Sequence, residues 1–400
     1  MKILFLTDNF PPEVNAPATR TYQHCREWVK LGAEVTVITC FPNFPKGEIY
    51  AGYKNKLYQK EVIDGINVIR VWSYIASNSG TIKRTLDYLS FGIMAVLFGL
   101  FRKTDVIIGT SPQFFTPCAA RVLHILKRKP WIFEVRDLWP ESIKAVGAIS
   151  NERILRFLEK LEMSLYKSAN KIVVVTDTFK KNISSRGIDE TKIEIIKNGV
   201  ILPENVSNQN ERLREKLGLK DKFVVGYIGT HGLAHKLDFI LDSAPAVNSN
   251  VHFLLIGDGA QKSNLLDQHK KLGLQNLSML EPIPKEEIFN YIAAIDVALV
   301  YLKKSDAVKT VLPSKIFENA ALQEPILMGV EGEAKELIES YDAGLCFIPE
   351  DRNDFLNKLD SIHSDKEQYN RFQFGCQNLA KDFKREKLAL RMYEILKSLV

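Results

Sequence analysis

The sequence predicts an α/β protein built from two doubly wound parallel-sheet domains, and three observations support this fold class. The chain has 400 residues, more than one α/β core usually holds. Short apolar runs rich in β-branched residues alternate with longer helical stretches, and the runs lack the polar alternation of half-exposed strands. Two such series occur, one in each half of the chain, which indicates two domains.

The expected strands of the first half lie at residues 2–7, 34–39, 66–72, 105–110, 131–136, 171–176 and 193–198. Those of the second half lie at 223–229, 251–257, 277–280, 296–301, 325–329 and 344–349. Helical segments such as Arg20–Leu31, Asn151–Ser168 and Glu286–Ala294 fit between them. The polar stretch 203–216 indicates a linker followed by a helix start. We therefore predict a first domain at 1–203, a second at 204–380, and a helix at 381–400 that packs back on the first domain.

The amino-acid composition indicates an ordinary soluble protein and disfavours a disulfide-stabilised or zinc-binding one. Hydrophobic residues make up 46% and charged residues 26%, as in ordinary soluble domains. The five cysteines are scattered without CxxC spacing, and no secretory signal follows Met1, so we expect a cytosolic chain without disulfides or zinc. The net charge of +6 conceals 29 Lys/Arg against 19 Asp/Glu in residues 1–200, and 25 against 29 in the remainder. A basic first half favours an anionic partner, with solvated surface lysines as the alternative.

Candidate site residues follow the expected strands, because ligands of open parallel sheets bind beyond the carboxyl ends of strands. Glu13 and Arg20 follow the first strand, Asp137 the fifth and Asn198 the seventh. For each of these loops the alternative interpretation is a set of capping residues, since Asp and Asn favour such places.

Two segments of the second half could hold a phosphorylated ligand. In the turn 229–232, two glycines bracket Thr230 and His231 between a strand and a helix, where backbone N–H groups point at an anion. In the segment 310–326, Lys315 and Glu318 are i,i+3 neighbours on a helix. An ammonium can hold a diphosphate and a carboxylate can accept from ribose hydroxyls. A simple surface Lys–Glu pair is the alternative.

Taken in order, the motifs of the whole chain resemble retaining glycosyltransferases of family 4. The matching stretches are LFLTDNFPPE with ATR, FPNFPKGEIYAGY, RVWSY, TSPQFF, FEVRDLWPES, KNGV, GTHGLAHKLD, IGDGA and PSKIFE. The resemblance implies the GT-B fold, with two Rossmann-like domains and an interdomain cleft. It is closest to the WbuB-like branch, whose members resemble N-acetyl-L-fucosamine transferases of O-antigen and capsule assembly.

The resemblance also implies roles for individual residues. The second domain would bind the donor through Asn198, Gly229, Thr230, His231, Gly232, Lys236, Asp258, Ile283, Ser314, Lys315 and Glu318. In that set Glu318 would hold the ribose, Ser314 and Lys315 the diphosphate, and Asp258 with the backbone near Ile283 the nucleobase. Catalytic roles would fall to Glu13, Arg20, Asp137 and Lys315, the first three in loops that face the acceptor.

This sequence departs from the family at two places. Thr310 replaces the first of two glutamates, and Thr230 and His235 lie where the family has a basic pair beside the phosphate turn. Neutralisation of the diphosphate would then fall to Lys315, with Lys236 or Lys309 as further candidates.

The expected reaction moves an N-acetylated sugar, such as N-acetyl-L-fucosamine or N-acetylglucosamine, from a UDP-sugar to a lipid-linked, undecaprenyl-type glycan. We expect no metal, because no Asp-x-Asp pair is present. The resemblance further implies no other cofactor and no nucleic-acid partner. The main alternative is a UDP-N-acetylglucosamine 2-epimerase-like isomerase on the same fold. A sugar-binding protein is a third candidate, and the lack of GxGxxG after any strand disfavours a nicotinamide dehydrogenase.

An apolar segment of the first domain suggests a membrane surface. Residues 88–101 carry no charge, but this run is shorter than the ~20 residues of a spanning helix. Basic residues flank it and occur again at 121–129. Basic flanks favour an anionic leaflet, so we expect a protein peripheral to the inner face of the cytoplasmic membrane. The alternative is a core helix that covers a parallel sheet.

Overall fold

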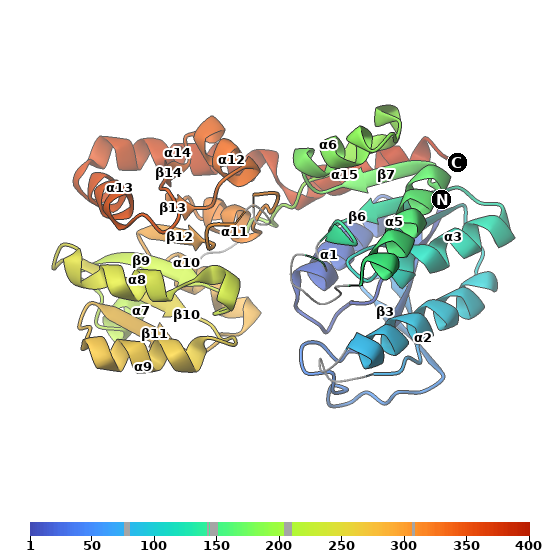
Figure 1. The fold of residues 1–400 in the computed structure, drawn as a ribbon, viewed down its shortest axis with the longest axis horizontal. Coiled ribbons are helices and arrows are strands. Elements are labelled where there is room, and N and C mark those ends of the chain that lie inside the picture. Colours follow the sequence, from blue (N-terminus) through green and yellow to red (C-terminus); the bar gives the residue numbers. More distant parts are fainter. Residues whose placement is uncertain (76–80, 142–143, 145–150, 204–209, 306–308) are drawn as a thin grey trace. The chain divides into compact units, whose positions relative to one another are not determined.

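The computed structural model describes residues 1–75, 81–141, 144, 151–203, 210–305 and 309–400, which form two α/β units. Unit 1 comprises Met1–Lys197 and Arg385–Val400, and unit 2 comprises Asn198–Lys384. The sequence analysis put the two crossings between units at 203/204 and 380/381. Figure 1 shows the elements of both units.

Unit 1 contains a sheet with the strand order β3-β4-β2-β1-β5-β6-β7-β8. Its strands are β1 Lys2–Leu6, β2 Glu34–Cys40, β3 Tyr58–Ile63, β4 Ile66–Val71, β5 Val106–Thr110, β6 Trp131–Val135, β7 Lys171–Val174 and β8 Ile193–Ile195. All pairs are parallel except β3 with β4. The helices are α1 Ala16–Lys30, α2 Thr81–Leu100, α3 Phe115–Lys127, α5 Glu152–Ser168, α6 Asp177–Ser185, the 3₁₀ turn η1 Glu190–Lys192 and α15 Arg385–Lys397.

Unit 2 contains a parallel sheet with the order β11-β10-β9-β12-β13-β14. Its strands are β9 Phe223–Ile228, β10 Val251–Ile256, β11 Leu277–Leu280, β12 Val297–Tyr301, β13 Ile326–Gly329 and β14 Gly344–Cys346. Its helices are α7 Asn210–Lys216, α8 Asp238–Ser243, α9 Lys262–Leu272, α10 Ile288–Ile292, α11 Lys315–Ala321, α12 Glu333–Tyr341, α13 Arg352–Ser364 and α14 Lys366–Asp382, with 3₁₀ turns η2 Leu233–His235, η3 Ala244–Ala246 and η4 Lys285–Glu287. Two parallel-sheet units confirm the predicted fold class.

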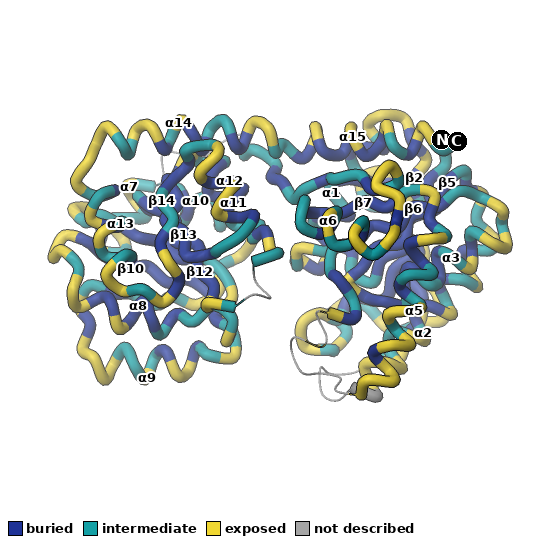
Figure 2. Tube along the Cα trace, turned by 45° about the horizontal axis from the view of Figure 1, so that its top comes forward, coloured by how far each residue is buried: buried dark blue, intermediate teal, exposed yellow. Residues whose placement is uncertain are grey.

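The apolar runs of the sequence become the buried centres of both sheets. Every residue of β5, β6, β10, β12 and β13 is buried, and the strands are dark blue in Figure 2. Helices shield both faces of each sheet, and each sheet accordingly has two apolar clusters. Strands buried on both faces need no polar alternation, which is why continuous apolar runs in the sequence located them.

Strand β3 was not among the strands that the sequence analysis expected, although its hairpin partner β4 was expected at 66–72. Asp64 and Gly65 form the turn of this hairpin with φ values of 49° and 79°. An Asp-Gly pair is a strong hairpin signal, because both residues tolerate positive φ. The burial pattern of β3 alternates, as in an edge strand with one solvated face. The search for apolar runs therefore overlooked it.

The last helix, α15, packs on unit 1. The indole N–H of Trp28 in α1 donates to the carbonyl of Ala389 at 2.9 Å, and Leu388 and Met392 are buried in the cluster around Trp28. Arg385 donates from Nε to the amide oxygen of Gln23 at 2.8 Å. In Figure 1 this red helix lies among the blue and green elements of unit 1, so the chain closes its first unit with its last residues.

Candidate active site

Glu13 lies in the loop after β1, and its buried carboxylate joins that loop to the next. The side chain is 2% exposed. Its Oε1 accepts hydrogen bonds from the backbone N–H groups of Asn43 and Phe44, both at 2.9 Å, and its Oε2 accepts from Phe10 N–H at 3.3 Å. Burial raises the pKa of Glu13 despite these donors. The carboxylate therefore holds the loop 41–53 against the loop that follows β1.

Arg20 extends from α1 to the carboxyl ends of β6 and β8. It is 1% exposed, and its Nε donates to Glu134 Oε1 at 3.0 Å. Its Nη1 and Nη2 donate to the carbonyls of Lys197 and Ile196 at 2.9 and 2.8 Å. Burial acts to raise the pKa of Glu134, but Arg20 and Arg136 outweigh it and hold that pKa below its ordinary value. Arg20 thus joins a helix to two strand ends.

Asp137 is half-buried just after β6, and its backbone N–H donates to Ser111 Oγ at 3.2 Å. Asp8, which the sequence analysis did not select, follows β1 at the same sheet edge. Burial, Asp87 and Glu13 together raise the pKa of Asp8 to about 8. An aspartate directly after a central parallel strand was the signal that could have identified it.

In unit 2, the turn after β9 lies against the turn after β10. Gly229 N–H donates to the carbonyl of Ile256 at 2.8 Å, and His231 N–H donates to that of Asp258 at 2.8 Å. Gly257 has φ 142°, and a Cβ there would lie 1.9 Å from the Gly229 carbonyl oxygen. Only glycine permits this approach, which packs the predicted phosphate turn tightly against its neighbour.

Lys315 lies beside the same turn. A Cβ on Gly229 would lie 2.4 Å from Lys315 Cε and 2.5 Å from its Nζ. The ammonium also lies 3.6 Å from the ring centroid of Tyr227, the penultimate residue of β9. Burial lowers the pKa of Lys315 to about 7, while Glu318 acts to raise it. The structure thus brings the predicted cation to the predicted turn.

Two histidines flank the ring of Tyr227, at centroid distances of 6.0 Å for His231 and 6.2 Å for His235. His231 is completely buried, and neither of its ring nitrogens has a hydrogen-bond partner within the described part of the chain. Burial, assisted by Lys262 and Lys315 at His231 and by Lys315 at His235, lowers the pKa of each imidazole to about 4. Both imidazoles are therefore neutral at physiological pH.

Helix α11 carries Lys315 and Glu318 in its first turn, so the two are i,i+3 neighbours as predicted. Ser314 is the residue before the helix, and its side chain makes no capping hydrogen bond. Ser314 and Glu318 are half-buried. The N–H groups of Ile316 and Phe317 donate to the carbonyls of Pro313 and Ser314 at 3.2 and 3.1 Å, so the first turn is closed by its own backbone.

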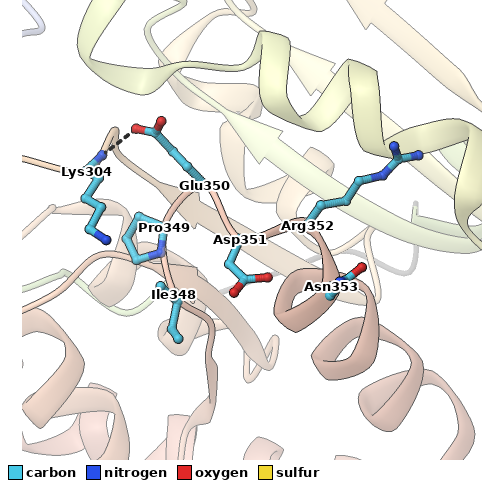
Figure 3. Close-up of a pocket in the computed structure, with 7 residues that line it drawn as sticks. All are labelled: Lys304, Ile348, Pro349, Glu350, Asp351, Arg352 and Asn353. Atoms are coloured by element: carbon cyan, nitrogen blue, oxygen red, sulfur yellow. Dashed lines mark hydrogen bonds between the residues drawn. The ribbon is translucent and has the colours of Figure 1, made fainter.

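Lys236 points to a different neighbour. Its ammonium lies 3.2 Å from Glu350 Oε2, and Glu350 Oε1 accepts from the backbone N–H of Lys304 at 2.9 Å. Figure 3 shows the hydrogen bond between Lys304 and Glu350, two of the residues that line a cavity of about 400 Å³. The cavity is lined by Lys304, Ile348, Pro349, Glu350, Asp351, Arg352 and Asn353, none of which was a predicted site residue.

The remaining predicted residues are less tightly grouped. Asp258 is exposed, with Oδ1 accepting from Gly259 N–H at 2.8 Å, and Thr230 is exposed at the tip of the turn. Ile283 packs half-buried against an apolar cluster, while Gly232 and Asn198 are half-buried. Among the residues that the structure describes, no group of three or more His, Cys, Asp or Glu side chains is arranged to hold a metal ion.

Two family models match the chain. Residues 17–202 match the family described as Glycosyltransferase Family 4, and residues 209–374 match Glycosyl transferases group 1. One model lies mainly in each unit, and together they span most of the chain. Both describe transferases, and neither describes the isomerase that the sequence analysis kept as an alternative.

Individual relatives agree with these models. WcaI of Escherichia coli, whose name assigns it to colanic acid biosynthesis as a glycosyl transferase, is 22% identical over 88% of this chain and 89% of its own length. WbjE of Pseudomonas aeruginosa, named as a glycosyltransferase, is 27% identical over 65% of this chain and 66% of its own. The structure of HepE from Anabaena, in complex with UDP and glucose, has a TM-score of 0.74 at 17% identity and covers 100% of both chains.

Proposed function

Because this chain is a glycosyltransferase with the GT-B fold, we propose that it moves a sugar from a UDP-sugar to a lipid-linked glycan acceptor in polysaccharide biosynthesis. The Lys315 ammonium, which lies beside the glycine turn at the carboxyl end of β9, carries the donor part of this proposal. Ligands of parallel sheets bind at this end of the strands, and an ammonium suits a diphosphate. UDP in the HepE structure supports the choice of nucleotide.

In the proposed reaction, the bond between the anomeric carbon and the β-phosphate oxygen breaks, and its electron pair leaves with UDP. The acceptor hydroxyl oxygen bonds to the same face of that carbon, and its proton passes to the departing phosphate oxygen. Configuration is retained. Lys315 stabilises the charge that develops on the diphosphate, and one such donor is worth about 3–4 kcal/mol.

The finer proposal is that the sugar is N-acetylated, as the resemblance to N-acetyl-L-fucosamine transferases implies, and that no metal is required. The test uses purified protein with UDP-N-acetyl-L-fucosamine or UDP-N-acetylglucosamine and an undecaprenyl-diphosphate-linked saccharide. Transfer should survive EDTA, and the product's anomeric coupling constant should match the donor's. Loss in EDTA that magnesium or manganese restores would overturn metal independence, and inversion would overturn retention.

The lipid of the acceptor suggests that unit 1 lies on a membrane surface. Helix α2 buries Phe91 and Ala95, while Leu86, Leu89, Ile93 and Leu97 form an aliphatic stripe that is 41–53% exposed. The stripe repeats every three or four residues, as one helix face does. No helix in the described residues is long and apolar enough to cross a bilayer. Helix α2 thus has both a core face and a face suited to lipid. Helix α3 packs on α2, and the basic residues at 121–129 lie in α3 and directly after it.

Co-sedimentation with vesicles of anionic phospholipid tests this part. Binding should weaken with salt, because exposed charges are screened, and it should weaken at least tenfold in Arg128→Glu with Lys129→Glu, at about 1 kcal/mol per cation. Lys270→Glu with Lys271→Glu makes the same charge change in unit 2 and should leave binding unaltered. Wild-type protein that stays in the supernatant at low salt would disprove the membrane role and leave the donor chemistry untouched.

A further inference from the structure

Exposed aromatic side chains follow two neighbouring strands of unit 1. Strands β2 and β4 pair in parallel with Cys40 opposite Val71, so the segments after these residues leave the sheet at one edge. Phe44 follows β2 and is 44% exposed, and Trp72 directly follows β4 and is 38% exposed. With half-buried Tyr50, these residues form what we call the aromatic edge.

The loop that carries Phe44 is rigidly held. The backbone N–H of Phe44 donates to the buried Glu13 carboxylate at 2.9 Å. Within the loop, Gly47 N–H donates to the Asn43 carbonyl at 2.8 Å, and the Tyr50 hydroxyl donates to the Phe44 carbonyl at 2.6 Å. Hydrogen bonds thus hold the backbone of this loop on both sides of Phe44, yet Phe44 remains 44% exposed.

A buried arginine joins this loop to the other strand end. Arg70 in β4 is fully buried; its Nε donates to Glu61 at 2.6 Å, its Nη1 donates to the Cys40 carbonyl at 3.2 Å, and its Nη2 donates to the Pro11 carbonyl. The ring of Tyr53 covers the guanidinium at 4.9 Å. Glu13 and Arg70 together therefore tie the segments after β1 and β2 to each other and to strand β4.

A partly exposed aromatic residue on a held backbone, at the end of a parallel sheet where ligands bind, is suited to recognition because an aromatic side chain loses little conformational entropy on binding. A pyranose ring is amphipathic: its axial C–H face packs on an aromatic ring, and its hydroxyls reach polar groups at the rim. The aliphatic stripe on α2 suits acyl chains instead. We propose that the aromatic edge binds the saccharide portion of the acceptor. This inference rests on the proposed function for the identity of the acceptor.

The experiment measures binding of the full chain, saturated with UDP, to an array of lipid-free O-antigen and capsule oligosaccharides. Wild-type protein should bind a subset of them. Phe44→Ala and Trp72→Ala should each weaken that binding at least tenfold, and Phe44→Tyr, which keeps the ring, should restore it. Leu57→Ala is the matched control: Leu57 is 65% exposed, and its carbonyl accepts the Trp72 N–H at 3.1 Å. It should bind within twofold of wild type.

Calorimetry with UDP separates this inference from the proposed function. All variants should bind UDP as tightly as wild type, because Phe44 and Trp72 lie in the other unit from the donor residues. Wild-type protein that binds no saccharide, or alanine variants that bind as wild type does, would overturn the saccharide subsite even if UDP binds. Suppose instead that the wild type does not bind UDP, while Phe44→Ala and Trp72→Ala lose the saccharide binding that the wild type shows. That result would overturn the proposed function and support the saccharide subsite.

Discussion

The ammonium of Lys315 lies 3.6 Å from the ring centroid of Tyr227, at the point where β9 enters the glycine turn. An aromatic face attracts a cation without occupying its N–H donors. The side chain therefore remains able to donate to an anion bound at the turn. Burial makes its charge costly in the free protein, and a diphosphate would remove that cost.

Replacing Lys315 by methionine should lower turnover by about 10²–10³, because one preorganised donor to the leaving group is lost. The same change should raise the melting temperature at pH 6–7, since a lysine whose folded pKa is lowered costs stability wherever it must be charged. Lys335→Met, on the exposed side of α12, is the matched control for both measurements. Turnover close to wild type in Lys315→Met would remove the residue from the mechanism.

UDP binding should take up a proton between pH 7 and 9. Burial lowers the pKa of Lys315 to about 7, so above this pH the free protein holds mostly neutral amine. The bound diphosphate should restore the charge, and affinity should fall by up to about tenfold per pH unit as pH rises. Calorimetry at pH 8 in buffers of different ionisation enthalpy measures the uptake directly. His231 and His235, with pKa values of about 4, stay neutral here, and Lys315→Met should show no uptake.

Glu318→Ala should weaken UDP binding and raise KM at least as much as it lowers kcat, because a contact to the ribose serves ground and transition states alike. The sharper test compares UDP with 2′,3′-dideoxy-UDP in wild type and variant. The analogue should bind more weakly than UDP to wild type and equally to Glu318→Ala, which isolates the pairwise interaction. A preference for UDP that persists in the variant would place the ribose contact elsewhere.

Glu324→Gln should stabilise unit 2 at neutral pH. Glu324 is 8% exposed, and burial together with Asp296 raises its pKa well above the ordinary value, while Arg214 opposes this. A carboxyl group whose pKa is raised by folding favours the folded state at low pH. This contribution to stability is lost progressively as the pH rises above the pKa of an unfolded glutamate, about 4.3. The variant should therefore melt higher at pH 7–8, by about 2–4 °C for each kcal/mol, and equal wild type near pH 4. If the variant and the wild type melt at the same temperature at every pH, ionisation of Glu324 does not destabilise the folded protein.

Local pattern predicted much of this protein. Apolar runs located every strand except the half-exposed β3, because continuous hydrophobicity indicates burial on both faces and β3 has one solvated face. Helical spacing placed Lys315 and Glu318 in one turn of α11. Whether the apolar segment at 81–103 covers the sheet or faces outward was left open, and α2 does both, with Phe91 buried and Ile93 exposed one-half turn away.

Sequence by itself determined the parallel-sheet class and the order of the strand-end loops, because each depends on neighbours a few residues apart. It determined the reaction class through the family resemblance of its motifs. Only the tertiary structure decided how the site side chains are engaged. Arg20 meets Glu134, Lys236 meets Glu350 and Lys315 meets Tyr227, all across long stretches of chain. Burial and charge at such a group depend on whatever packs against it, and no periodicity in the sequence records a partner that lies 80 or more residues away.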